Sequence, residues 1–96
     1  MAYQERDLIR VYRALGEPTR LAIVRLLAQR DEVGCGELTG SLGLTRPTLS
    51  YHTRILEESG LIRVRKEGPF RFYSLDRETV ERLAPAALPR GSGHDG

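Results

Sequence analysis

The first third of the chain has the spacing of apolar residues that is typical of α-helices. Over residues 3–15, one helical stripe carries Leu8, Val11, Tyr12 and Leu15. Residues 18–29 are apolar on nearly every side, as in a helix at the middle of a core. Gly16 separates the two segments, and Pro18 fits the first turn of the second helix, where its missing N–H costs nothing. The pattern therefore predicts two consecutive helices.

Two shorter helices are predicted next, close together in the sequence. A polar turn over residues 29–36 leads to a short helical segment over 37–42, which is broken at Gly43. Thr45 is a good N-cap for a fourth helix over residues 46–58. The inward face of that helix is expected to carry Leu49, Thr53 and Leu56.

The last third of the chain changes from a helical to an alternating pattern. Residues 61–66 alternate, residues 67–69 read as a turn, and residues 70–75 are rich in aromatic side chains, which together are typical of a β-hairpin. Asp76 can cap a last helix over residues 78–83. The predicted fold is mainly α with a small β-hairpin, a winged helix-turn-helix of order α-α-α-α-β-β-α.

The length of 96 residues corresponds to one domain. We assign it to residues 1–89, with dimerisation helices at both ends, and expect residues 90–96 to be a disordered tail. A monomer this small buries a limited part of its surface, so a second copy would stabilise it. The expected homodimer interface consists of Leu8, Val11, Tyr12, Val80 and Leu83. No apolar run approaches the ~20 residues that cross a bilayer and the charged start is unlike a signal peptide, so we expect a cytoplasmic protein without a membrane partner.

Positive charge is concentrated in one part of the chain. The net charge is only +2, but residues 45–75 hold six basic residues against three glutamates. A basic strip on an otherwise near-neutral body indicates a polyanionic partner, whereas without a motif beneath it the strip would be an ordinary solvated surface.

A motif does lie beneath this strip. Two short helices joined around a glycine form a helix-turn-helix, whose second helix can enter the major groove of DNA. The first half of the helix over 46–58 has no carboxylate, because Glu57 and Glu58 come only at its end, and approach to phosphates demands such an arrangement. The residues expected to contact double-stranded DNA are Arg46, Thr48, Ser50, Tyr51 and Arg54 on the helix and Arg65, Lys66 and Arg71 on the hairpin.

Four segments of the chain resemble the ArsR/SmtB family of repressors. They are ALGEPTRL from residue 14, EL from 37, RPTLSYH from 46 and LEESGLI from 56, and the resemblance covers about residues 14–75. The family is dimeric, pairs its first and last helices and releases DNA on binding an effector, so the resemblance implies a dimeric repressor. It also implies that Thr48, Ser50 and Tyr51 face base edges and that Arg54 contacts a phosphate.

The chain departs from the metal-sensing members of that family. Those members carry Cys-x-Cys at the third helix, but here Gly34 and Gly36 occupy the thiolate positions and the only cysteine, Cys35, stands between them. A second metal site of the family needs Asp and His on the last helix, and residues 76–89 contain no His. Soft metals need several thiolates or imidazoles at one point, so we expect no metal and no cofactor.

A few single residues have competing interpretations. Cys35, expected to be exposed near a helix start, is a candidate redox sensor or a chance cysteine. His52 is a packed histidine bonded within the domain or a DNA or metal contact, and His94 in the tail is inert or a ligand. Ser50 and His52, two residues apart on one helix, point to different faces and cannot form a nucleophile–base pair, so no enzyme is expected. The alternative function is a winged helix that binds another protein and not DNA.

Overall fold

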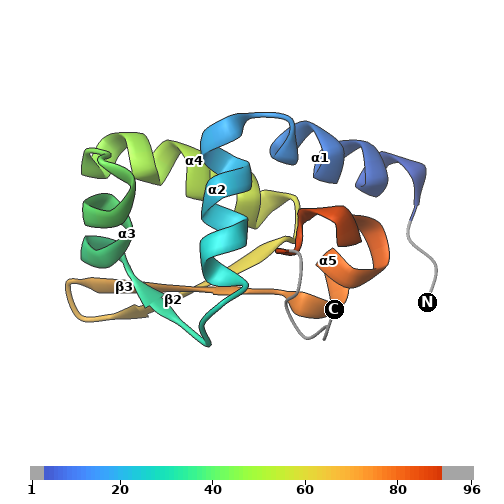
Figure 1. The fold of residues 1–96 in the computed structure, drawn as a ribbon. Coiled ribbons are helices and arrows are strands. Elements are labelled where there is room, and N and C mark those ends of the chain that lie inside the picture. The colour runs from blue at the N-terminus through green and yellow to red at the C-terminus, as the bar shows by residue number, and fades with distance from the viewer. Residues whose placement is uncertain (1–3, 90–96) are drawn as a thin grey trace.

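The structure, a computed structural model, describes residues 4–89 and follows the predicted order of elements with two additions (Figure 1). The predicted tail over residues 90–96 lies outside this range. Within it, no helix is long and apolar enough to cross a membrane. In order, the elements are α1 (Glu5–Leu15), α2 (Pro18–Leu27), β1 (Val33–Gly34), α3 (Cys35–Leu42), α4 (Arg46–Glu58), β2 (Ile62–Glu67), β3 (Phe70–Leu75), α5 (Arg77–Leu83) and the 3-10 turn η1 (Pro85–Ala87).

The helices begin where the sequence supplies caps for their first N–H groups. The side chains of Thr45 and Asp76 accept hydrogen bonds from backbone N–H groups three residues on, at the starts of α4 and α5. Pro18 occupies the first turn of α2, as predicted, and the Glu17 carboxylate before it accepts from the Arg20 N–H at 2.9 Å. Gly43 ends α3 with a φ of 66°, which glycine adopts without strain.

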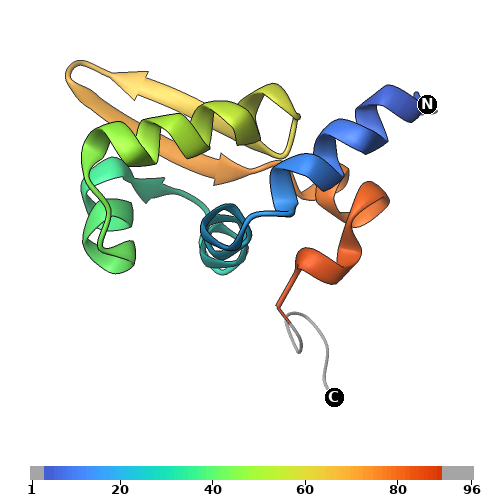
Figure 2. The same cartoon turned by 90° about the horizontal axis from the view of Figure 1, so that it is seen from above.

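The core is built around α2, which lies in the middle of the molecule and is seen end-on in Figure 2. The α2 side chains that reach it are Ile23, Val24 and Leu27. From α4, the three residues predicted to face inward, Leu49, Thr53 and Leu56, are all buried. This confirms that the opposite side of α4 is the exposed one.

Two residues predicted for the dimer interface belong to this core. Val11 on α1 and Val80 on α5 have no exposed surface, and both pack within the hydrophobic cluster of the single chain. Val11 lies at the centre of the predicted stripe on α1, and the side chains of both residues point inward. The prediction that they contact a second copy is therefore wrong.

The predicted hairpin is part of a three-stranded antiparallel sheet with strand order β1-β3-β2. Its unpredicted strand β1 lies in the segment that was read as a polar turn over residues 29–36. Val33 pairs with Tyr73 and Gly34 with Phe72. Val33 is almost completely buried, and α3 begins directly after the strand at Cys35, two residues before its predicted start. The buried side chain of Val33, in an otherwise polar segment, thus anchors the connection between α2 and α3 to the sheet.

Candidate nucleic-acid interface

Helix α4 runs alongside the β2–β3 hairpin (Figure 2). Side chains of both line an open groove. It consists of two adjoining hollows of about 260 and 470 Å³ that share Ser50, Arg71 and Tyr73. We call it the α4–hairpin groove, and its cationic lining residues are Arg46, Arg54, Lys66 and Arg71. These four come from three consecutive elements, α4, β2 and β3.

The strand register explains why Lys66 and Arg71 lie in this groove. Val64 is paired with Tyr73 and Lys66 with Arg71. Since side chains alternate across a sheet, both pairs lie on one face, the inner pair against the core and the outer pair toward the tip. Near the hairpin tip, the sheet face that lines the groove beside α4 therefore carries two cations, Lys66 and Arg71.

The cations of the groove are available to a ligand. Within residues 4–89, none of the four forms an ion pair with a carboxylate, and Glu57 is the groove's acidic lining residue. Arg30 and Arg63, by contrast, are paired with Glu37 and Asp76. Four unpaired cations against one carboxylate give the groove a positive potential, which suits a polyanion.

The polar residues predicted to read bases lie at the start of α4. Thr48 and Tyr51 are exposed, Tyr51 by 61%, and Ser50 is half-buried in the groove wall. The Thr45 hydroxyl donates to the Thr48 Oγ at 3.0 Å. These positions agree with the expected outer face of α4, and base contact by each residue stays a prediction.

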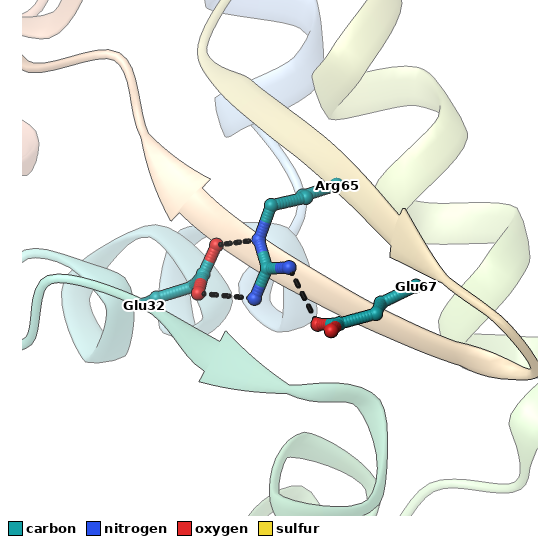
Figure 3. A network of polar contacts seen from close by, with 3 residues as sticks. All are labelled: Glu32, Arg65 and Glu67. Atoms are coloured by element: carbon teal, nitrogen blue, oxygen red, sulfur yellow. Dashed lines mark hydrogen bonds and ion pairs between the residues drawn. The ribbon is translucent and has the colours of Figure 1, made fainter.

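Arg65 is held by two carboxylates, unlike the other cations predicted to contact DNA (Figure 3). Its Nε and Nη2 donate to the Glu32 carboxylate at 3.0 and 2.9 Å, and its Nη1 donates to Glu67 at 2.7 Å. Its guanidinium carbon lies 4.5 Å from the centre of the Phe72 ring. Hydrogen bonds from Arg65 hold the pKa of Glu32 below its ordinary value.

The position of Arg65 in the sheet follows the same alternation that places Lys66. Arg65 pairs with Phe72, between the two pairs that face α4, so it projects from the opposite side of the sheet. A phosphate bound in the α4–hairpin groove would therefore lie on the other side of the sheet from the Arg65 guanidinium. The expectation that Arg65 is an available phosphate contact needs revision, because Glu32 and Glu67 already neutralise it.

His52 is a packed histidine, which agrees with the first of its two interpretations. It is 9% exposed, and its Nδ1 lies 3.2 Å from Nη1 of Arg20 and 3.9 Å from the Glu17 carboxylate. Arg20 also donates from Nε to the Ala14 carbonyl at 2.7 Å. Sequence reasoning did not identify Arg20, although it belongs to the segment that carries the family resemblance. The residue links the α1–α2 junction to α4.

Cys35 is half-buried at the first turn of α3, not exposed as expected. It lines the α4–hairpin groove next to Tyr73, whose phenol has a pKa raised by burial. Gly34 and Gly36 on either side provide no donor side chain, so this stretch does not fit the thiolate site of the metal sensors. Among the described residues, no group of three or more His, Cys, Asp or Glu side chains could hold a metal.

The outer face of α1 exposes two large apolar side chains. Tyr12 was predicted for the dimer interface and is 55% exposed, and Ile9, which was not predicted, is 45% exposed. Leu8 and Leu83, the other predicted interface residues, are half-buried. The i,i+3 spacing of Ile9 and Tyr12 was the signal that could have identified this second apolar stripe.

Comparison with known proteins agrees with this geometry. A family model described as a helix-turn-helix domain matches residues 15–65, from the end of α1 into β2. The arsenical resistance operon repressor of Escherichia coli is 37% identical over 67 residues, which span 70% of this chain and 57% of that protein.

Two solved structures share the fold over most of its length. An ArsR family transcriptional regulator, RHA00566, aligns with a TM-score of 0.77 and 28% identity over 90% of this chain and 88% of its own. The homodimeric winged helix-turn-helix DNA-binding domain Mb0332 from Mycobacterium bovis, a possible ArsR-family regulator, aligns with a TM-score of 0.73 and 32% identity. That alignment covers 86% of this chain and 82% of the other.

Proposed function

The chain belongs to the ArsR family of winged helix-turn-helix transcription regulators, and from this membership we propose that it is a dimeric repressor that holds operator DNA in the α4–hairpin groove and releases it when an effector binds. With operator DNA as its partner, the protein is expected to act in the cytoplasm. The proposed activity is reversible DNA binding and includes no catalytic step.

The observation that carries the proposal is the set of four unpaired cations in the groove. Two stand on the helix that would enter the major groove and two on the hairpin that would follow the adjacent backbone. Each is free of carboxylate partners within residues 4–89, so DNA binding need not break an ion pair at these four positions. Phosphate contacts of this kind position the protein, and the side chains of Thr48, Ser50 and Tyr51 are the proposed base readers.

Dimerisation is proposed through the outer face of α1. Ile9 and Tyr12 expose apolar surface there, beside an apolar hollow of about 520 Å³ that Tyr12, Leu15 and the residues of η1 line. The homodimeric state of the Mycobacterium bovis domain supports a homodimer here, and the choice of the α1 face rests on its exposed apolar side chains. Two copies would present two α4 helices to successive half-sites, which for twofold readers lie ~34–36 Å apart.

Binding to unrelated duplex DNA at several salt concentrations tests the proposal. A fluorescence anisotropy titration should give a dissociation constant that rises steeply with salt, since each phosphate contact contributes ~0.9 to the slope of the log–log plot. Four contacts per subunit set an upper bound of roughly 3.6 per subunit. A protein-interaction module would not bind the duplex even at low salt, and that result would refute the proposal.

A further inference from the structure

A second cationic site lies between α1 and the C-terminal half of α4. It is a cavity of about 480 Å³ lined by Arg10, Arg13 and Arg20, with Ile55 and Glu58 from α4. We call it the α1–α4 cavity. It shares no lining residue with the α4–hairpin groove, so the proposed DNA contacts leave it unused.

The lining indicates the chemical class of a ligand. Three arginines and one glutamate line the cavity, and within residues 4–89 neither Arg10 nor Arg13 forms an ion pair. Buried Ala14 and half-buried Ile55 add an apolar wall. Guanidinium groups bind carboxylates and phosphates in a bidentate manner, and an apolar wall favours a ligand with a hydrocarbon body. The cavity therefore suits a small organic anion.

Arg20 connects this cavity to the DNA-reading helix. Its Nε donates to the Ala14 carbonyl and its Nη1 lies 3.2 Å from Nδ1 of His52, while the same side chain lines the cavity. His52 is buried on α4, directly after the exposed Tyr51, and the two rings meet edge to face with centroids 5.1 Å apart. An anion that draws the Arg20 guanidinium toward itself competes with the contact that holds His52.

The second connection is along α4 itself. Tyr51, Ile55 and Glu58 have i,i+4 and i+7 spacing, so the cavity lies on the same side of the helix as the proposed base reader. We propose that the α1–α4 cavity binds a small organic carboxylate or phosphate, and that binding changes DNA affinity through Arg20 and His52. The second half of this statement rests on the proposed DNA-binding function, and the first half does not.

Binding of the ligand class is tested without DNA. Isothermal titration calorimetry with phenyl phosphate and with benzoate, each at up to millimolar concentration, should show saturable binding of at least one probe to the wild-type protein. Arg13→Ala should weaken that binding about tenfold, because a hydrogen bond to a charged group contributes roughly one factor of ten or more. Arg6→Ala is the matched control, an exposed arginine of α1 outside the cavity lining, and should leave binding unchanged.

Two outcomes of this experiment overturn the site. One is that neither probe binds the wild-type protein. The other is that Arg13→Ala and Arg6→Ala weaken binding equally, which would mean a diffuse surface attraction. A DNA titration without probe can also overturn the site. If Arg13→Ala lowers the salt slope of duplex binding by ~0.9 for each phosphate that Arg13 would neutralise, the cavity binds a DNA phosphate and not a small anion.

The coupling is tested by measuring duplex affinity with and without the probe that binds, at matched ionic strength. Addition of the probe should change the affinity of the wild-type protein for the duplex. Arg20→Lys keeps the positive charge, but its single ammonium cannot replace the forked donors that hold Ala14 and His52, so it should still bind the probe and lose the effect on DNA. An equal effect of the probe on both proteins would refute transmission through Arg20. Failure to bind any duplex would refute the proposed function and leave the calorimetric result standing.

Discussion

Arg65 and Lys66 are adjacent in β2, and the structure predicts different effects of removing them on the salt dependence of DNA binding. Lys66 faces the α4–hairpin groove without a carboxylate partner, whereas Arg65 faces the other side of the sheet between Glu32 and Glu67. We expect Lys66→Ala to lower the log–log salt slope by ~0.9 per phosphate contact, or roughly 1.8 for a dimer in which both subunits lack the lysine. Arg65→Ala should change the slope much less than Lys66→Ala does.

The charges of the cluster also predict the sign of a smaller effect. Arg65 carries one positive charge and its two partners carry two negative charges, so the cluster is already net negative. Removing Arg65 makes this part of the β2–β3 hairpin more negative and should weaken DNA binding modestly, whatever the DNA sequence. Glu32→Gln removes a negative charge instead and should strengthen binding at low salt, with the difference fading as salt screens it.

The assay is fluorescence anisotropy of a labelled duplex at four or more salt concentrations, for the wild-type protein and the three variants side by side. Thermal melts of the same samples check that each variant is folded, because the Glu32–Arg65 contact ties the hairpin to the segment before β1. If Arg65→Ala lowers the slope as much as Lys66→Ala does, the assignment of the two faces of the sheet is wrong.

Four further results are expected. Tyr51→Ala should change which operator sequences are preferred, by roughly 1–3 kcal/mol for each base contact that Tyr51 makes, and unchanged preference in a binding-site selection would refute the orientation of α4. Leu49→Ala should destabilise the fold by about 2–5 kcal/mol in urea denaturation, since Leu49 is fully buried. Tyr12→Glu should shift sedimentation toward monomer without lowering thermal stability of the monomer, and an unchanged dimer would exclude this face. The pKa values of Glu17 and Glu32 are lowered in the folded protein, by the Arg20 N–H and by Arg65 respectively. Both carboxylates therefore stabilise the fold at pH values above their ordinary pKa of 4.5, and this stabilisation is lost as the pH falls through the lowered pKa values. In a series of urea denaturations from pH 7 to pH 3, the midpoint should fall below about pH 4.5, and less steeply in Glu32→Gln.

Local signals in the sequence predicted the helices well because the physics of helix ends is local. Thr45 and Asp76 cap helices from within three residues, and Pro18 and Gly43 act on their own backbone. The strand β1 was missed because it is two residues long and one of them is glycine. Its existence depends on pairing with a strand about forty residues later, and nothing local to Val33 indicates that pairing.

A helical stripe shows which residues are apolar but not what covers them. Val11 and Tyr12 are neighbours on one predicted stripe, yet Val11 is fully buried in the monomer and Tyr12 is 55% exposed. The two side chains are separated by one helical step, about 100° around α1. A residue at the centre of the stripe goes to the chain's own core, and one at its edge is left for a partner. Only the position of α2 and α4 beside α1 decides where the centre lies.

The charge of a sequence segment is likewise a poor measure of the charge that DNA can use. Residues 45–75 carry six basic side chains, but Arg63 and Arg65 are paired with carboxylates, and Arg65 finds Glu32 thirty-three positions earlier in the chain. What remains available is decided by strand alternation, which turns Lys66 toward α4 and Arg65 away from it. A one-residue shift of β2 against β3 would exchange the two and turn Glu67 toward α4. The pairing of half-buried Val64 with buried Tyr73 fixes that register, so the packing of the core determines which cations the protein presents to DNA.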